Sequence, residues 1–163
     1  LAFEPAERGL MQRPPRDPKA PILSGFLIWR IIFVSLILVT GTFGLFLWER
    51  EHGASIELAR TVAVNTLVMF EVFYLLSVRH LLSPAMSRET IFSNRYVWIA
   101  IGLLIIFQLC LTYVGMMQVL FNTTDMGIES WLRVILVTSS VLVLVEFEKM
   151  ILRLYSKRKP LVL

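Results

Sequence analysis

Long apolar blocks alternate with short polar segments along this chain. Four blocks lie at about 22–48, 57–78, 96–119 and 130–152. Each is long enough to cross a bilayer, because about 20 residues in a helix span a hydrocarbon core of about 30 Å. A helix satisfies its own backbone hydrogen bonds in lipid, and the sequence lacks the alternating segments of a β-barrel. The pattern therefore predicts an all-α membrane protein with a bundle of four transmembrane helices.

Charge predicts the orientation of these helices. Hydrophobic residues make up 56% of the chain and charged residues 17%, fewer charges than in soluble domains. Twelve Lys and Arg residues lie in the N-terminal arm, in the loop between the second and third blocks, and around the C-terminal tail, against three on the other side. The positive-inside rule then places both termini in the cytoplasm. The net charge of +4 reflects this topology, and no basic face for a nucleic acid is visible.

The tryptophans mark the same boundaries independently of charge. Trp29 and Trp98 lie near predicted cytoplasmic ends of blocks, and Trp48 and Trp131 lie near the outer ends. These are the depths at which an aromatic belt forms in membrane proteins. We expect a multi-pass integral protein of the plasma membrane or bacterial inner membrane, with the lipid bilayer as its first partner.

The predicted organisation has three parts. Residues 1–21 form a polar, proline-containing cytoplasmic arm, residues 22–152 the transmembrane module, and residues 153–163 a basic cytoplasmic tail. The chain opens at Leu1 instead of methionine, and its first residues resemble the end of a helix that enters a loop. This start indicates a piece of a larger protein.

Signatures of soluble enzymes are absent from the sequence. It contains no phosphate-binding glycine loop, no Cys or His cluster at metal-ligand spacing and no nucleophile elbow. His52 and His80 lack partners at ligand spacing and are interpreted as interface residues, and Cys110 as a small apolar residue within the third block. We therefore expect no catalytic residue and no cofactor-binding residue in this chain.

Glu71 is the informative residue. It lies near the middle of the second block, where a charge costs about 2.5–3.5 kcal/mol on insertion scales. The other residues on its helical face are mostly apolar, and only Tyr74 offers a nearby hydroxyl. An ionised Glu71 would need a partner from another helix, water or a bound cation. The alternative is a protonated glutamic acid that is hydrogen-bonded to a neighbouring helix.

Small and polar residues within the blocks predict where helices pack against each other. Glycines let two backbones approach closely, and hydroxyl and amide side chains form hydrogen bonds between membrane helices. The residues with this interpretation are Gly41, Gly44, Thr61, Asn65, Gln108 and Thr112. Arg30 lies about one turn inside the cytoplasmic boundary, from where its side chain can reach the headgroups. An ion pair between Arg30 and Glu146 or Glu148 of the fourth block is a further hypothesis.

Several segments carry a resemblance to a known family. MQRPPR at 11–16 and PILSG at 21–25 resemble the loop that leads into the seventh membrane helix of P-type cation ATPases, most closely the reticulum-type calcium pumps and their bacterial relatives. VNTLV at 64–68 resembles part of the eighth helix, NRY at 94–96 the entry to the ninth and VEFEK at 145–149 the end of the tenth. The resemblance covers nearly the whole chain in order.

This resemblance implies a function. Such pumps transport cations at the expense of ATP and Mg²⁺ through an aspartyl-phosphate, whose motif is absent here, so this polypeptide alone is not expected to hydrolyse ATP. It resembles the C-terminal module that braces the transport helices, with the missing helices and cytoplasmic domains as partners. Glu71 matches a carboxylate that ligates calcium in the reticulum-type pumps, which makes Ca²⁺ the expected transported ion. Arg13 and Arg16 would lie at the cytoplasmic surface, where they could relay motion between the phosphorylation domain and the helices.

Two functions of different classes remain open from the sequence. The first is the transmembrane module of a cation pump. The second is a stand-alone four-helix scaffold or accessory protein without transport activity. A small channel is disfavoured, because only one block carries an ionisable group in the middle of the membrane.

Overall fold

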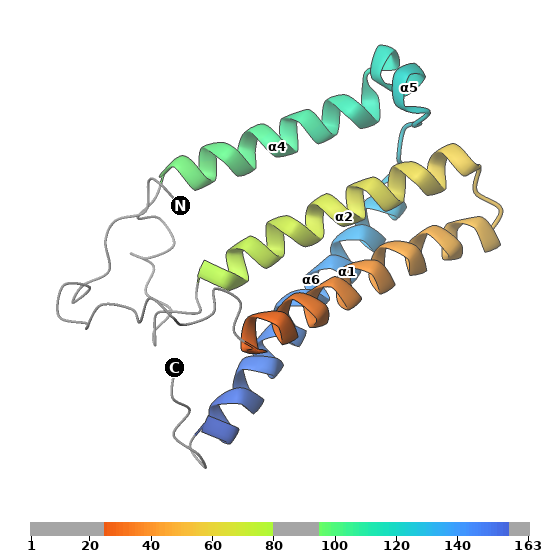
Figure 1. Cartoon of the computed structure of the whole chain (residues 1–163). Helices are drawn as coiled ribbons and strands as arrows, with labels where there is room; N and C mark the ends of the chain where they lie inside the picture. Colours follow the sequence, from red (N-terminus) through yellow and green to blue (C-terminus); the bar gives the residue numbers. More distant parts are fainter. Residues whose placement is uncertain (1–24, 80–94, 157–163) are drawn as a thin grey trace.

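The computed structural model describes residues 25–79 and 95–156, and its regular elements there are all helices (Figure 1). They are α1 (Gly25–Glu51), α2 (Ile56–Arg79), α4 (Arg95–Tyr113), α5 (Gly115–Phe121) and α6 (Ile128–Ser156). Four of them, α1, α2, α4 and α6, are long and apolar enough to cross a membrane. The predicted all-α fold with four transmembrane helices is confirmed. The side of the membrane on which the termini lie stays a prediction.

A tight turn makes α1 and α2 antiparallel. Gly53 adopts a positive φ of 83°, a conformation that costs glycine little because it has no Cβ. Ser55 then caps α2: its Oγ accepts a hydrogen bond from the backbone N–H of Leu58 at 3.1 Å. This turn and the segment 122–127 before α6 lie at one end of the molecule, which we call the loop end. The opposite end, where α1 starts and α6 finishes, is the terminal end.

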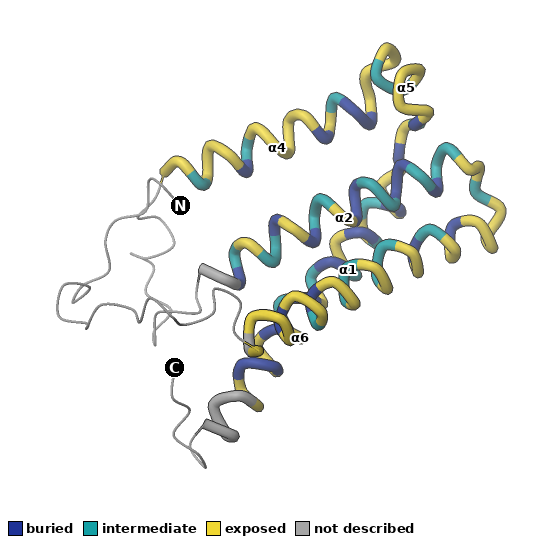
Figure 2. The backbone as a smooth tube through the Cα atoms, viewed as in Figure 1, coloured by how far each residue is buried: buried dark blue, intermediate teal, exposed yellow. Residues whose placement is uncertain are grey.

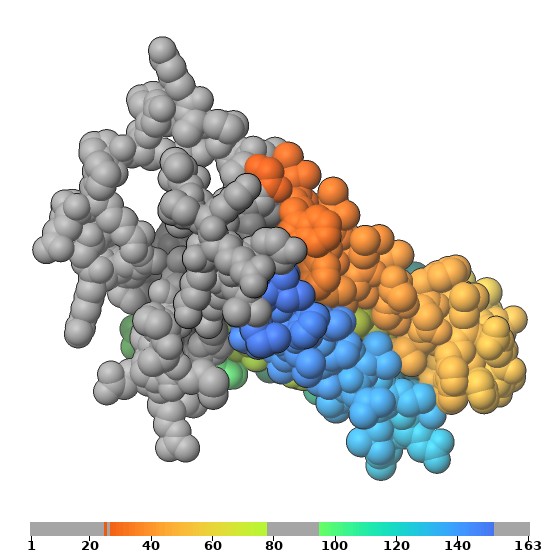
Figure 3. Space-filling model, turned by 90° about the horizontal axis from the view of Figure 1, so that it is seen from below, coloured from red at the N-terminus to blue at the C-terminus, as the bar shows by residue number. Residues whose placement is uncertain are grey.

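Helices α1, α2 and α6 form a packed bundle, with α2 in contact with both of the others (Figure 1). Phe70 of α2 is fully buried and packs against Val141 and Val145 of α6. On the α1 side, a Cβ atom added at Gly41 would collide with the Phe70 ring, so the absence of a side chain lets the two helices approach. Gly44, by contrast, has no atom within 4 Å of such a Cβ. The face seen in Figure 3 shows α1 and α6 side by side.

Helix α4 stands apart from this bundle along most of its length (Figure 2). Its buried residues are Ile101, Gln108, Leu111 and Thr112, and three of these four lie in its last two turns, towards the loop end. The remaining side chains of α4 are mostly apolar and exposed. Exposed apolar side chains of this kind are suited to contact with lipid or with further membrane helices.

Candidate functional site

Glu71 lies on the exposed face of α2 that also carries Leu67 and Leu75, which we call the free face. Its side chain is exposed, and Leu67 and Leu75, one turn before and after it, are 41% and 42% exposed. The opposite faces of α2 are the ones covered by α1 and α6. Among the described residues, no hydrogen bond or ion pair reaches the Glu71 carboxylate. The Glu71 carboxylate, in the middle of a membrane span, is therefore accessible to lipid or to other helices that pack against this face of α2.

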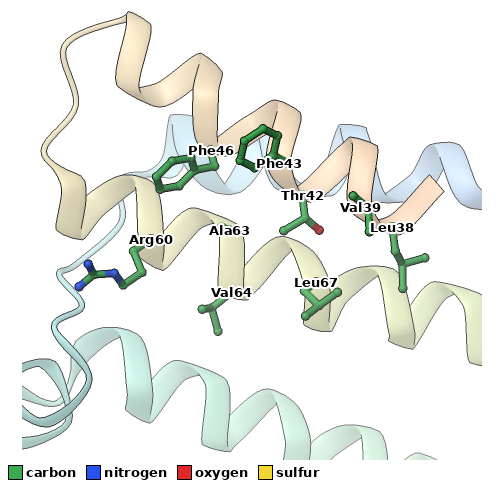
Figure 4. Close-up of a pocket in the computed structure, with 9 residues that line it drawn as sticks. All are labelled: Leu38, Val39, Thr42, Phe43, Phe46, Arg60, Ala63, Val64 and Leu67. Carbon is green, nitrogen blue, oxygen red and sulfur yellow. The ribbon is translucent and has the colours of Figure 1, made fainter. Parts of the chain in front are cut away.

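A groove between α1 and α2 adjoins this face, with a cavity volume of about 490 Å³ (Figure 4). Leu67 lines the groove and also lies on the exposed face of α2 that carries Glu71. Thr42 provides a hydroxyl oxygen that is buried and has no hydrogen-bond partner among the described residues. The α1–α2 groove is lined by Leu38, Val39, Thr42, Phe43, Phe46, Arg60, Ala63, Val64 and Leu67. It is almost wholly apolar, which fits a membrane helix or lipid better than a soluble ligand.

Asn65 joins α2 to α4 at the loop end. Its Nδ2 donates to the backbone oxygen of Thr61 at 2.9 Å and to Thr112 Oγ1 of α4 at 3.1 Å, and it also contacts Met126 Sδ at 3.3 Å. Thr61 Oγ1 in turn accepts a hydrogen bond from the backbone N–H of Thr124 at 2.9 Å. These contacts hold α4 and the segment before α6 against α2.

A buried ion pair joins α1 to α6 at the same end. Arg133 donates to Glu49 Oε1 through Nη2 at 2.9 Å and through Nε at 3.1 Å, and the Glu49 side chain is only 4% exposed. Arg133 Nη2 also donates to Ser130 Oγ at 3.0 Å, and the guanidinium lies 4.5 Å from the centre of the Trp48 ring. Sequence reasoning missed this pair, because Glu49 and Arg133 lie at the edges of blocks far apart in the chain. Their only signal was a charge at the end of one block and another near the start of the fourth.

Charged residues also gather at the terminal end, with partners that differ from those hypothesised. Arg30 is buried, and its Nε donates to the hydroxyl of Tyr74 at 3.4 Å. Within the described residues it forms no ion pair with Glu146 or Glu148. Glu146 pairs instead with a residue of its own helix, because Lys149 lies one turn later on α6 and its Nζ is 2.5 Å from Glu146 Oε1.

Glu148 is a second buried charged residue at the terminal end. Its side chain lies on the inner face of α6, and neither carboxylate oxygen has a hydrogen-bond partner among the described residues. Lys149, the next residue, donates instead to the backbone oxygen of Ser77 on α2 at 3.1 Å.

The hypothesised role of Arg13 and Arg16 falls on residues outside those that the structure describes.

The described residues alone do not build a metal site. Within residues 25–79 and 95–156, no three His, Cys, Asp or Glu side chains come together to hold a metal ion. Calcium takes about six to eight oxygen ligands, so a cation at Glu71 would need most of its ligands from outside these residues.

Comparison with known proteins links this architecture to one family. The family model described as "Cation transporting ATPase, C-terminus" matches residues 1–151. The chain is 39% identical over 154 residues to the "Probable cation-transporting ATPase F" of Mycobacterium tuberculosis. The aligned region covers 94% of this chain and 17% of that protein.

Two further relatives come from other organisms. The chain is 35% identical over 136 residues to the "Cation-transporting ATPase pma1" of Synechocystis, with 80% of this chain and 15% of that protein covered. It is 32% identical over 162 residues to the "Calcium-transporting ATPase 1" of Schizosaccharomyces pombe, with 99% and 18% covered. The chain thus spans less than a fifth of the length of these curated relatives.

Proposed function

Since the chain belongs to the family of C-terminal segments of cation-transporting ATPases, we propose that it is the transmembrane module that braces the transport helices of an ATP-driven calcium pump. We further propose that Glu71 supplies one carboxylate to the cation site of that pump. The names of several relatives, which include calcium-transporting ATPases, support calcium as the cation. ATP and Mg²⁺ would bind to parts of the pump outside this chain.

The exposure of Glu71 is the observation that carries the proposal. A charge at this depth costs about 2.5–3.5 kcal/mol on insertion scales if it faces lipid. Contact with a cation and with polar groups of other helices offsets that cost. A carboxylate oxygen is also the ligand type that a hard cation such as calcium prefers.

The bracing role rests on how firmly α1, α2 and α6 are joined. Tight packing at Gly41 and Phe70, together with the buried Glu49–Arg133 pair, holds the three helices at a fixed spacing. The α1–α2 groove and the free face with Glu71 then form one continuous surface on a rigid support. A transport helix seated in this groove would bring its own polar groups to the level of Glu71.

The test is calcium uptake and calcium-activated ATP hydrolysis by the full-length pump in vesicles, with and without Glu71→Gln. This substitution keeps the side-chain size and removes the charge. We expect the calcium concentration for half-maximal activity to rise about tenfold or more, equivalent to at least about 1.4 kcal/mol. Glu129→Gln is the matched control, because the Glu129 side chain is 92% exposed at the loop end.

Each outcome of this test separates the parts of the proposal. An unchanged calcium affinity in Glu71→Gln would show that Glu71 is structural and that the module acts only as a support. Activation of the unmodified pump by another cation, with no response to calcium, would refute calcium as the substrate. A loss of affinity in the Glu129→Gln control would mean that charge removal acts through folding.

A further inference from the structure

The connection between α4 and α6 contains a break that the apolar pattern does not reveal. Helix α4 ends at Tyr113, and Val114 adopts an extended conformation with φ −86° and ψ 117°. Helix α5 follows for seven residues and ends at Phe121; Asn122, which caps it, has a left-handed conformation with φ 53° and ψ 47°. Figure 1 shows α5 as a separate short helix beyond the end of α4. The chain therefore turns here at the loop end of the molecule.

A broken helix frees backbone carbonyls, and here the protein itself satisfies them. The carbonyl oxygen of Leu111 accepts a hydrogen bond from Thr123 Oγ1 at 3.0 Å, and that of Thr112 accepts one from Gln118 Nε2 at 2.7 Å. In water, solvent would satisfy these groups at little cost. Non-helical backbone at membrane depth is tolerated only where internal partners replace water. The two side-chain hydrogen bonds thus fit a segment with little access to water.

The outward side of the same segment is apolar. Met116 is 79% exposed, Val119 84% and Leu120 69%, and Ile128 at the start of α6 is 80% exposed. No charged residue lies between Arg95 and Asp125. Gln118, the one polar side chain of α5, is hydrogen-bonded to the backbone of α4, while large apolar side chains of this segment are exposed. A patch of this kind on a water-exposed loop would be costly.

Aromatic residues indicate the depth of α5. Trp131 Nε1 donates to the hydroxyl of Tyr113 at 2.7 Å, and that hydroxyl donates to the backbone oxygen of Met126 at 2.9 Å. Trp and Tyr with bonded polar tips are typical of the boundary between hydrocarbon and headgroups. Tyr113 lies two residues before α5, so α5 begins at this boundary.

We propose that α5 lies in the lipid interface at the loop end, with Met116, Val119 and Leu120 inserted among the acyl chains. The partner is the bilayer itself. The interaction is hydrophobic and needs no anionic headgroup, because this segment carries no Lys or Arg. Inserted in this way, α5 fixes the depth of the end of α4, which the Asn65–Thr112 and Trp131–Tyr113 hydrogen bonds join to the bundle.

The test uses the full-length pump in vesicles, with cysteines introduced by Val119→Cys, Leu120→Cys or Glu129→Cys. A water-soluble maleimide is applied to both sides of the membrane, and labelling is quantified for each peptide by mass spectrometry. We expect positions 119 and 120 to react at least about tenfold more slowly than position 129, because the reactive thiolate forms poorly away from water. In a parallel sample, a phosphatidylcholine with a photoreactive group near the end of an acyl chain should cross-link to the α5 peptide.

Two results would overturn the proposal. Labelling of positions 119 and 120 as fast as position 129 would place α5 in water. Slow labelling without any lipid cross-link would mean that another part of the polypeptide covers α5. Retained calcium-activated ATP hydrolysis in each variant verifies that the pump is folded, and a variant that loses it is replaced by Met116→Cys.

Discussion

Replacing Arg133 with glutamine should destabilise the joint between α1 and α6 far more than its surface position indicates. The Arg133 side chain is 29% exposed, but its partner Glu49 is 4% exposed. The substitution removes two charge-assisted hydrogen bonds to Glu49 Oε1 and the contact with the Trp48 ring. It leaves a buried carboxylate without a counter-ion.

The magnitude follows from the geometry. Two unit charges 2.9 Å apart attract by about 6 kcal/mol at an effective dielectric constant of about 20. Desolvation of both groups offsets part of this attraction, and the exposed fraction of Arg133 allows water to screen it further. Removing one partner of a buried pair typically costs about 3–5 kcal/mol. With the screening of Arg133, we expect a loss of about 2–3 kcal/mol in the free energy of unfolding.

The assay is reversible unfolding in mixed micelles by an increasing fraction of denaturing detergent, followed by tryptophan fluorescence. Trp48 lies against Arg133 and Trp131 is close by in the chain, so the signal includes this joint. Glu129→Gln is the matched control: Glu129 lies 4.0 Å from the same guanidinium but is 92% exposed, and its loss should cost at most about 0.5 kcal/mol.

A double-mutant cycle sharpens the test. The double variant Glu49→Gln with Arg133→Gln should lose clearly less free energy of unfolding than the sum of the two single variants. Each single variant leaves one charge of the pair without its partner, and the double variant leaves none. If Arg133→Gln proves no more harmful than Glu129→Gln, or if the two effects simply add, the reasoning about a buried pair is refuted.

Two further predictions concern the glycines of α1 and the N-terminal arm. Gly41→Ala should destabilise the chain by about 1–3 kcal/mol in the same unfolding assay, because its Cβ would collide with the buried Phe70 ring. Gly44→Ala should be neutral or stabilising by up to about 1 kcal/mol, since it adds helix propensity in open space, and equal effects at both positions would contradict the packing argument. Neutralising Arg13 and Arg16 together in the full-length pump should lower calcium uptake per ATP hydrolysed, and an unchanged ratio would count against a coupling role.

The positions of the helices could be predicted from the sequence with good accuracy, except in the third block. Apolar blocks at about 22–48 and 57–78 correspond to α1 and α2, whose ends differ by a few residues. The third block, at about 96–119, is divided between α4 and α5. Hydropathy does not reveal this break, because Val114 is itself apolar and the block from 96 to 119 contains no charged residue. Hydrogen bonds from the side chains of Gln118 and Thr123 satisfy carbonyl oxygens near the break, and these contacts depend on the tertiary structure.

The candidate site could be predicted only in part. Glu71 stood out because a mid-span carboxylate is costly at any rotation of its helix. Its exposure on the free face depends on which sides of α2 are taken by α1 and α6, and the sequence does not specify this. Arg30 illustrates the same difficulty, because its depth could be estimated but its hydrogen bond to Tyr74 depends on the rotation of two helices.

The amino-acid sequence alone determined that this chain forms four membrane-spanning helices, because length and apolar character decide whether a helix can cross lipid. It also identified the family through the short proline–arginine segment and the order of the blocks. Tertiary structure decided which faces meet: Gly41 against Phe70, Glu49 against Arg133, and Asn65 against Thr112. Lipid is as apolar as most side chains of the four long helices, so hydrophobicity does not select the contacting faces. Shape and a few buried polar groups select them, and these act between residues far apart in the chain.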